Sequence, residues 1–159
     1  MDIENLLTTL GIPFERLSHE PIMTMEEGME IADKLRFTPV KNLFLVDKQG
    51  QHYLLLLEGN KKFKAEVVSK QLGCSHLSFA SPEDMQKLLG INPGAVSVLA
   101  LANDEQKLVR LLIDRDILAM SFVGCHPGVN TASVKLRTDD LLKVFLPHIN
   151  HADFEIVEV

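Results

Sequence analysis

Two short apolar runs joined by a polar turn constrain the fold of this chain more than any other feature. Residues 40–46 (VKNLFLV) and 53–57 (YLLLL) each have the length of one strand, and Asp47 and Gly50 mark a turn between them. Continuous apolar runs of this length, bounded by turn residues, are typical of strands covered on both faces. The pattern therefore predicts a β-hairpin at the centre of the protein, buried on both sides of its sheet.

Further helices and strands are interspersed around this hairpin. Helical spacing or helix-start residues predict helices at residues 3–10, 24–35, 64–72, 81–90 and 138–147. Short apolar or alternating runs predict strands at residues 13–18, 77–80, 95–101, 108–113, 120–124, 131–136 and 154–157. A polar segment separates 95–101 from 108–113, so we expect these two strands to form a second hairpin. The mixture indicates an α+β fold, with a mixed, largely antiparallel sheet and flanking helices.

Three of the predicted helices begin with residues that can cap free amide groups. Thr24 and Glu27 form a capping box, in which each side chain can bond to the other residue's backbone. Ser81 followed by Pro82 marks a second start, and Thr138 marks the start of the last helix.

Length and composition indicate one globular domain spanning residues 1–159. The hydrophobic fraction of 46% and charged fraction of 24% are ordinary, and no apolar run approaches the roughly 20 residues that cross a bilayer. The N-terminus lacks the basic start of a signal peptide, and two cysteines make no disulfide framework. We therefore expect a cytoplasmic protein with no membrane partner. The net charge of −6 argues against non-specific coating of nucleic acid but leaves room for a local basic patch.

Two polar residues at the start of the first apolar run are the first candidates for a site. The charged amine of Lys41 must reach water, an anion or a partner. Lys41 either extends to solvent, the commoner fate of a lysine, or holds a phosphate or carbonyl oxygen as a fixed point charge. Asn42 is either an ordinary turn amide or a donor and acceptor for a small polar ligand. We interpret the pair as the floor of a site.

Histidines supply the next candidates. His126 lies in a Cys-His-Pro-Gly loop with Asn130 four residues on, and rigid loops between strands often carry sites. His19 follows a predicted strand and precedes Pro21. For both histidines, a solvated or core-satisfied side chain is the competing interpretation. The other four histidines have no partner spacing and are expected at the surface: His52, His76, His148 and His151.

Thiol and metal chemistry find little support in the sequence. Cys125 adjoins His126, but neighbouring residues usually point to opposite sides, which disfavours the thiol–imidazole pair of a thioesterase. No Cys/His set has zinc spacing, and neither a Gly-rich phosphate loop nor a Gly-x-Ser-x-Gly elbow occurs. We expect no metal and no cofactor, and chemistry performed by positioned water and hydrogen bonds.

Several short motifs follow one another along nearly the whole chain. They are His19-Glu20-Pro21, Thr24-Met25-Glu26-Glu27, Lys41-Asn42-Leu43-Phe44-Leu45, Leu77-Ser78-Phe79-Ala80, Leu89-Gly90-Ile91-Asn92-Pro93-Gly94-Ala95-Val96-Ser97, His126-Pro127 and Asn130-Thr131-Ala132. Each is weak alone, but the combination resembles the YbaK-like aminoacyl-tRNA deacylases, in particular the free-standing prolyl-tRNA editing proteins. The resemblance implies a YbaK-like fold with a curled sheet, and a pocket for the 3′-aminoacyl-adenosine of a mischarged tRNA.

The resemblance also implies roles for individual residues. Lys41 would engage the 3′-terminal nucleotide, Asn42 would help to hold the aminoacyl group, and His126 would line the pocket and fix the substrate. Further substrate contacts are implied for His19, Thr24, Gly94, Ala95, Val96, Ser97 and Asn130. The terminal ribose hydroxyl of the substrate would help to activate the attacking water.

The implied function is trans-editing, the hydrolysis of Ala-tRNA(Pro). A synthetase pocket sized for proline cannot strongly reject alanine, because one or two methylenes are worth only about 1–3 kcal/mol. The expected partners are the mischarged tRNA and, transiently, prolyl-tRNA synthetase. A few lysines around a small pocket suffice to hold one end of an RNA. A net charge of −6 is therefore compatible with binding of tRNA.

The chain departs from the family pattern at two places. The Gly-x-x-x-Pro loop of the family ends in valine here, in Gly94-Ala95-Val96-Ser97-Val98, and Lys64-Ala65-Glu66 stands where the family tends to have Asp-Leu-Lys. Alternatives therefore stay open: a deacylase of tRNA carrying serine, cysteine or glycine, or a catalytically idle module that binds tRNA ends or a synthetase. A thioesterase that uses Cys125 is a more distant alternative.

Overall fold

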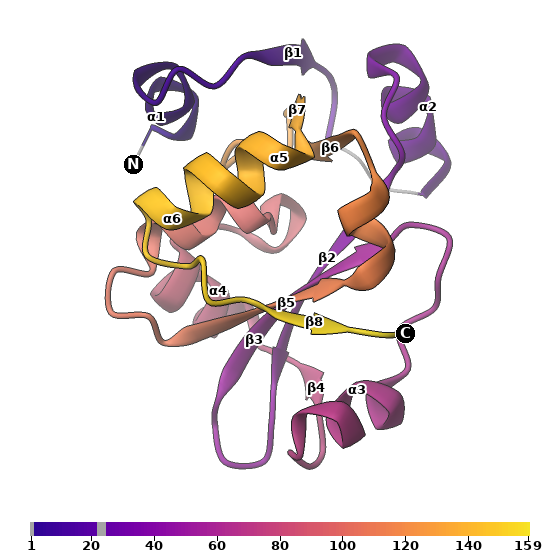
Figure 1. Ribbon diagram of the computed structural model, residues 1–159, viewed down its shortest axis with the longest axis vertical. Helices are drawn as coiled ribbons and strands as arrows, with labels where there is room; N and C mark the ends of the chain where they lie inside the picture. The colour runs from indigo at the N-terminus through magenta and orange to yellow at the C-terminus, as the bar shows by residue number, and fades with distance from the viewer. Residues whose placement is uncertain (1, 22–24) are drawn as a thin grey trace.

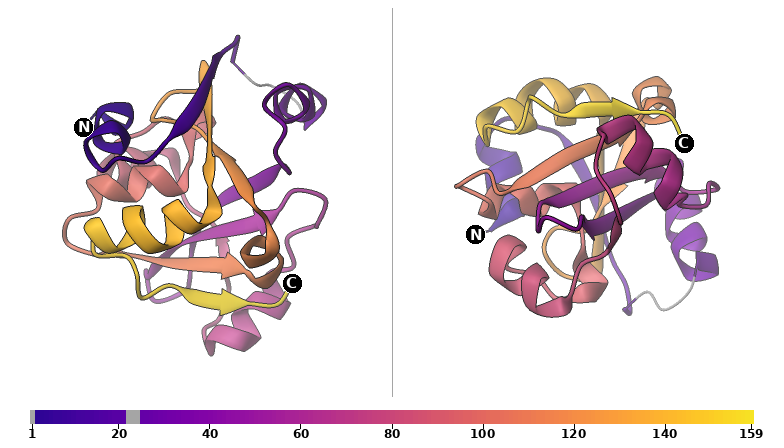
Figure 2. Two further views of the ribbon diagram at one scale, coloured as in Figure 1. Left: turned by 45° about the horizontal axis from the view of Figure 1, so that its top comes forward. Right: turned by 90° about the horizontal axis from the view of Figure 1, so that it is seen from below.

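The computed structural model of the chain describes residues 2–21 and 25–159, and these residues form two β-sheets with flanking helices (Figure 1). The larger sheet has the strand order β4 (Ser78–Phe79), β2 (Val40–Val46), β3 (His52–Glu58), β5 (Val109–Asp114) and β8 (Glu155–Val157). The smaller sheet has the order β1 (Phe14–Ser18), β7 (Ala132–Arg137) and β6 (Phe122–Cys125). Its strands run across those of the larger sheet (Figure 2).

The predicted central hairpin is confirmed. β2 and β3 pair antiparallel, with Asn42 opposite Leu56, and residues 53–57 of β3 are all buried. Side chains of β3 alternate between two apolar clusters, so Leu54 and Leu56 join the main core while Leu55 and Leu57 face the other side. A sheet buried on both faces explains why the run shows no polar alternation in the sequence.

Helices occur where the sequence predicts them. They are α1 (Ile3–Thr9), α2 (Met25–Leu35), α3 (Ala65–Leu72), α4 (Pro82–Leu89), and a last helix of α5 (Thr138–Asp140), a wider turn (Leu141–Phe145) and α6 (Leu146–His148). The last helix packs into the main core and α3 into the second cluster, so they cover opposite faces of the larger sheet (Figure 1). The α+β class, with a mixed and largely antiparallel arrangement of strands, is confirmed.

The predicted second hairpin is wrong. Residues 95–101 form parts of two 3₁₀ helices, η1 (Pro93–Ala95) and η2 (Val98–Asn103), and β5 pairs parallel to β3. Every residue from Val98 to Ala102 is buried, and a short apolar run that is fully buried has the same pattern in a helix as in a strand. Ser97 favours the helical conformation locally, because its Oγ accepts a hydrogen bond from the backbone N–H of Leu99 at the start of the 3₁₀ helix.

Three further expectations are corrected. Thr138 does not cap the last helix, since its Oγ1 is buried without a hydrogen-bond partner among the described residues. His151 is 2% exposed rather than a surface residue, and its Nε2 lies 3.0 Å from Asp104 Oδ2. His52 also has partners, since it stacks on Phe44 and bonds to a carboxylate of α4. The contacts of His151 with Asp104 and of His52 with Asp84 join residues 47 and 32 positions apart in the chain, which spacing cannot reveal. The capping residue Thr24 lies outside the described residues.

Candidate functional site

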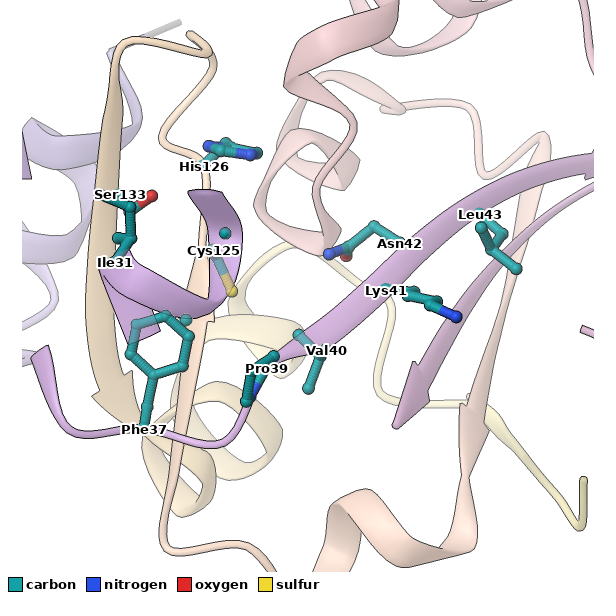
Figure 3. Close-up of a pocket in the computed structure, with 12 residues that line it drawn as sticks. Ile31, Phe37, Pro39, Val40, Lys41, Asn42, Leu43, Cys125, His126 and Ser133 are labelled. Atoms are coloured by element: carbon teal, nitrogen blue, oxygen red, sulfur yellow. The ribbon is translucent and has the colours of Figure 1, made fainter. Parts of the chain in front are cut away.

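A cavity of about 380 Å³ opens beside the start of β2, between α2 and the hairpin of β6 and β7 (Figure 3). Its lining residues are Gly28, Ile31, Phe37, Pro39, Val40, Lys41, Asn42, Leu43, Gly124, Cys125, His126 and Ser133. Most of them are apolar and a few carry polar groups, a composition typical of sites for small ligands. The structure thus brings Asn42 and His126, two of the predicted site residues, to one cavity.

His126 uses one ring nitrogen for the backbone and leaves the other for a ligand. Its Nδ1 lies 3.0 Å from the carbonyl oxygen of Ala132. Because a carbonyl oxygen only accepts, Nδ1 carries the proton and Nε2 is the acceptor of the neutral ring. Burial lowers the pKa of His126 below its ordinary 6.5, outweighing the bond to Ala132 that raises it. His126 therefore provides a fixed, uncharged hydrogen-bond acceptor.

The side-chain amide of Asn42 is held in one orientation. Its Oδ1 accepts a hydrogen bond of 3.0 Å from the backbone N–H of Val98. The amide nitrogen of Asn42 could not replace Oδ1 here, because it is itself a donor. The end of the side chain points toward the His126 side of the cavity (Figure 3). Asn42 therefore offers its NH₂ donors to a ligand, and its oxygen is already engaged.

Lys41 lies next to Asn42 on β2 but points to the opposite face of the sheet, because strand residues alternate. Its Nζ donates to the carbonyl oxygen of Lys61 at 2.7 Å, and Figure 3 shows the amine directed away from His126. The Lys61 amine is itself paired with Asp114 and Asp116, at 2.9 and 2.8 Å. The structure places the stem of Lys41 at the cavity and its ammonium group on the other face.

His19 lies near His126 and bonds to a residue that the sequence did not suggest. The two histidine rings are 6.3 Å apart, and His19 Nε2 lies 2.8 Å from Ser133 Oγ. His19 Nδ1 lies 2.7 Å from the Glu20 carbonyl oxygen, so in the neutral ring Nε2 accepts and the Ser133 hydroxyl donates. Ser133 was missed because the contact joins residues 114 positions apart.

A second hollow of about 330 Å³ adjoins the first. Its lining residues are Val40, Asn42, Leu43, Phe44, Phe79, Met85, Pro93, Gly94, Val96 and His126. Four of them, including Asn42 and His126, also line the larger cavity, so these two side chains stand where the hollows meet. A ligand bound at this junction can extend into both.

Gly94 and Asn130, both predicted site residues, are in direct contact. A Cβ atom on Gly94 would lie 2.8 Å from Asn130 Nδ2, so only glycine lets the Asn130 amide pack this closely. The neighbouring loop residues differ in their accessibility. Ala95 and Ser97 are buried, while Val96 is half-buried and lines the second hollow.

Phe37 and Gly124 form another close contact, which bounds the larger cavity. A Cβ atom on Gly124 would overlap the Phe37 ring, so the missing side chain lets the ring pack directly against β6. Neither residue was a sequence candidate. Gly124 precedes the Cys-His-Pro motif, and a glycine inside a strand pattern is a general signal of close approach by another group.

Cys125 is unsuited to act as a nucleophile. It is 3% exposed, and burial raises the pKa of its thiol to about 12, outweighing the hydrogen bond with Ser97 that lowers it. The reactive form of cysteine is the thiolate, which is scarce at neutral pH when the pKa is this high. This burial argues against the thioesterase hypothesis.

The described residues include no group of three or more histidine, cysteine, aspartate or glutamate side chains that could together hold a metal ion. Within those same residues, every helix is too short or too polar to cross a membrane.

Known proteins are similar to this chain in sequence and in fold. The family model for the aminoacyl-tRNA editing domain matches residues 19–144. Prolyl-tRNA editing protein ProX of Acetoanaerobium sticklandii is 37% identical over 139 residues, which cover 87% of this chain and 85% of that protein. Prolyl-tRNA synthetase associated domain-containing protein 1 of Danio rerio is 29% identical over 152 residues, covering 94% and 82%. The crystal structure of hypothetical protein APE2540 has the same fold, with a TM-score of 0.77, 19% identity and coverage of 100% and 99%.

The chain therefore belongs to the aminoacyl-tRNA editing domain family, as its motifs predicted. It is an aminoacyl-tRNA deacylase, a hydrolase whose substrate is a charged tRNA. Its fold is the YbaK-like fold expected from the resemblance. This assignment argues against the hypothesis of a catalytically idle binding module.

Proposed function

We propose that this protein is a trans-editing enzyme that releases alanine from Ala-tRNA(Pro). The observation that carries the proposal is that Asn42 and His126 both line the two adjoining hollows, which brings one donor group and one neutral acceptor to their junction. An ester carbonyl needs a donor, and a ribose hydroxyl needs an acceptor. The identity to the prolyl-tRNA editing protein ProX supports the prolyl system as the source of the substrate.

The reaction requires a water molecule to attack the ester carbonyl carbon. As the new C–O bond forms, negative charge develops on the carbonyl oxygen, and in this proposal the NH₂ group of Asn42 donates to it; the bond from Val98 N to Asn42 Oδ1, which leaves the NH₂ group as the ligand-facing end, supports this role. The bond to the ribose 3′ oxygen then breaks, and that oxygen takes up a proton. The products are free alanine and tRNA with an unmodified terminal ribose.

His126 serves this reaction as the acceptor that fixes the terminal ribose. Its Nε2 accepts a hydrogen bond from the ribose hydroxyl adjacent to the ester, and this hydroxyl orients and helps to activate the attacking water. Ala132 holds the ring in the tautomer that the contact needs. Water activated by the substrate removes the need for a protein nucleophile, which fits the high pKa of the Cys125 thiol.

The remaining predicted site residues have supporting roles in this proposal. Gly94 and Asn130 shape the loop that faces the ester, together with Ala95, Val96 and Ser97. His19 holds Ser133 at the wall of the cavity. Lys41 binds a phosphate of the terminal nucleotides from the other face of β2. Its ammonium group has three N–H donors, and only one of them is used by the hydrogen bond to the Lys61 carbonyl oxygen.

Selection against proline is assigned to the walls of the larger cavity. Phe37, packed against Gly124, limits the depth available to an amino-acid side chain. A compact methyl group fits where a pyrrolidine ring meets the Phe37 ring. Size exclusion of this kind supplies the second sieve that a proline-sized synthetase pocket lacks.

A deacylase for tRNA carrying serine, cysteine or glycine is the second candidate. The cavity volume of about 380 Å³ favours serine and cysteine within this class, since the space exceeds the needs of one methyl group. The discriminating experiment measures release of amino acid from a panel of tRNAs charged with alanine, serine, cysteine, glycine or proline. Faster release of alanine than of the other amino acids supports the first candidate, whereas release of proline at the same rate contradicts both.

The proposed substrate mechanism has its own test. Ala-tRNA(Pro) with a 2′-deoxy terminal adenosine lacks the hydroxyl that is bound by His126, so its hydrolysis should be slower by several orders of magnitude. Equal rates for the ribose and deoxyribose substrates would contradict ribose assistance while leaving the editing function intact.

We also propose that residues 1–159 form one editing domain and contact prolyl-tRNA synthetase transiently. One apolar core joins residues from Ile3 to Leu146, which supports a single folding unit. The Danio rerio relative is named for a prolyl-tRNA synthetase associated domain, which supports this partner.

A further inference from the structure

The edge of β2 beside the site is open. β4 pairs with β2 only at Leu45 and Val46, and in the part of the chain that the structure describes no other strand pairs with that edge at residues 40–43. The second hollow lies along this edge, because its lining includes side chains from both faces of β2, Asn42 from one and Leu43 from the other. A ligand in this hollow can reach across the edge from one face of the sheet to the other.

Phe79 stands at this edge with most of its ring uncovered. It is 65% exposed, more than any other large apolar side chain that the structure describes. Its pairing opposite Leu45 places the ring on the face of β2 that also carries Lys41. Phe63 supports it from one side, with ring centroids 5.8 Å apart and planes tilted by 58°. The ring is thus held by one aromatic neighbour and remains open to a planar ligand.

Lysines flank one member of this aromatic pair in the sequence. Lys62 and Lys64 flank Phe63 in sequence and both are exposed, and Lys41 lies on the same face of the sheet. The protein as a whole carries a net charge of −6, so this grouping of lysines is opposite in sign to the net charge of the protein. Aromatic rings set among lysines are the combination that binds single-stranded nucleic acid, by stacking of bases and neutralisation of phosphates.

We propose that Phe79 is a stacking platform for a nucleobase at the 3′ end of the tRNA. The terminal adenine lies in the second hollow against Phe79, its ribose reaches Asn42 and His126 at the junction, and the amino acid enters the larger cavity. This assignment rests on the proposed deacylase function and adds the position of the base. It also accounts for the placement of Lys41 on the far face, since the phosphate that precedes the base lies there.

Fluorescence of 2-aminopurine, placed in a tRNA as the terminal base, reports the stacking directly. Binding of the parent protein should quench the probe, as should Phe79→Trp, while Phe79→Leu should leave it unquenched. The matched control is Phe122→Ala, because Phe122 is also an exposed phenylalanine but lines neither hollow. Quenching that persists in Phe79→Leu would overturn the proposal.

Steady-state kinetics separate this proposal from the proposed function. Loss of one stacked base should raise KM for the aminoacyl-tRNA by about 5- to 150-fold in Phe79→Leu and change kcat little. Unchanged KM in an active Phe79→Leu enzyme overturns the platform and leaves the deacylase standing. If the parent releases no amino acid, the proposed function fails, and the quenching experiment still decides whether Phe79 binds the base.

Discussion

The backbone N–H of Val98 lies 3.0 Å from Asn42 Oδ1, and this hydrogen bond joins the 3₁₀ segment to the edge of the central hairpin. Val98 is the first residue of η2, a position whose N–H has no partner within the helix itself. Asn42 satisfies that donor, and its own amide is thereby turned so that the NH₂ group has no partner among the described residues. Proline at this position, as in the loop of the resembling family, has no N–H to donate.

Val98→Pro should therefore weaken catalysis by releasing the Asn42 side chain. Proline is well tolerated at the first position of a helix, so the fold should persist. Loss of one net hydrogen bond of about 0.5–1.5 kcal/mol predicts a decrease in kcat of about 2- to 12-fold, measured under saturating Ala-tRNA(Pro). Val98→Ala keeps the N–H and serves as the control. Equal kcat in the two variants would contradict an orienting role for this bond.

Asn42→Asp should abolish most activity without disturbing the loop. A carboxylate oxygen can still accept from Val98 N, but the side chain no longer donates to the ester oxygen and adds a negative charge. Removal of one donor to a developing oxyanion typically lowers kcat by about 10²–10³. Single-turnover rates compared with the thermal unfolding midpoint test this directly. A variant that is stable and fully active would remove Asn42 from the mechanism.

The pH dependence of activity should report the state of His126. Burial lowers its pKa below the ordinary 6.5, so the neutral ring persists to more acidic pH than for a free histidine. We expect kcat/KM to be level near neutral pH and to fall only as pH decreases through this lowered pKa. His126→Gln should lose that acidic limb. A limb centred above 6.5 would be inconsistent with the buried, neutral ring.

Phe37→Val should relax the selection against proline. The substitution shortens the wall that Phe37 forms against Gly124 and deepens the larger cavity. Because one or two methylenes change discrimination by about 10- to 200-fold, the rate on Pro-tRNA(Pro) should rise at least tenfold relative to that on Ala-tRNA(Pro). Both rates are measured on the same enzyme preparation. An unchanged ratio would place the size filter elsewhere.

The buried pair of His151 and Asp104 should make stability depend on pH. Burial lowers the pKa of His151, but hydrogen bonds to Asp104 and Ile149 outweigh it and leave the pKa raised above 6.5. Burial raises the pKa of Asp104, but bonds from His151, Val109 and Leu108 leave it lowered below 3.8. A raised histidine pKa stabilises the fold fully below 6.5 and loses this effect as pH rises through the folded value. A lowered aspartate pKa stabilises above 3.8 and loses the effect as pH falls through the folded value.

His151→Asn should therefore lower the free energy of unfolding most between about pH 4 and 6.5. Breaking a buried pair by removing one partner costs about 3–5 kcal/mol, measurable by urea unfolding at several pH values. The difference between parent and variant should shrink as pH rises above 6.5. A difference that grows with pH would show that the histidine is neutral in the folded protein.

Periodicity predicted most of the fold because most of its elements are bounded by residues with strong local effects. Gly73 and Gly90 adopt positive φ values of 69° and 66° at the ends of α3 and α4, where the sequence placed helix ends. The failure at residues 95–101 has a different cause. A run buried on every side carries no periodicity, so the same letters suit a strand and a 3₁₀ helix.

The sequence could suggest a residue of the candidate site only where the side chain's own chemistry sets it apart. Asn42 and His126 stand out as polar residues in an apolar run and in a loop rich in proline and glycine. Phe37 and Ser133 do not, because their importance comes from contacts with Gly124 and His19 that the folded chain creates. In contrast, the alternation of side chains along a strand is enough to predict that Lys41 and Asn42 point to opposite faces of β2.

The most direct test of the editing function is a single-turnover time course of amino-acid release, with enzyme in excess over tRNA(Pro) charged with either alanine or proline. We predict rapid release of alanine and no release of proline above the rate without enzyme. Alanine that stays attached at the uncatalysed rate, or proline released as fast as alanine, would contradict the proposed function.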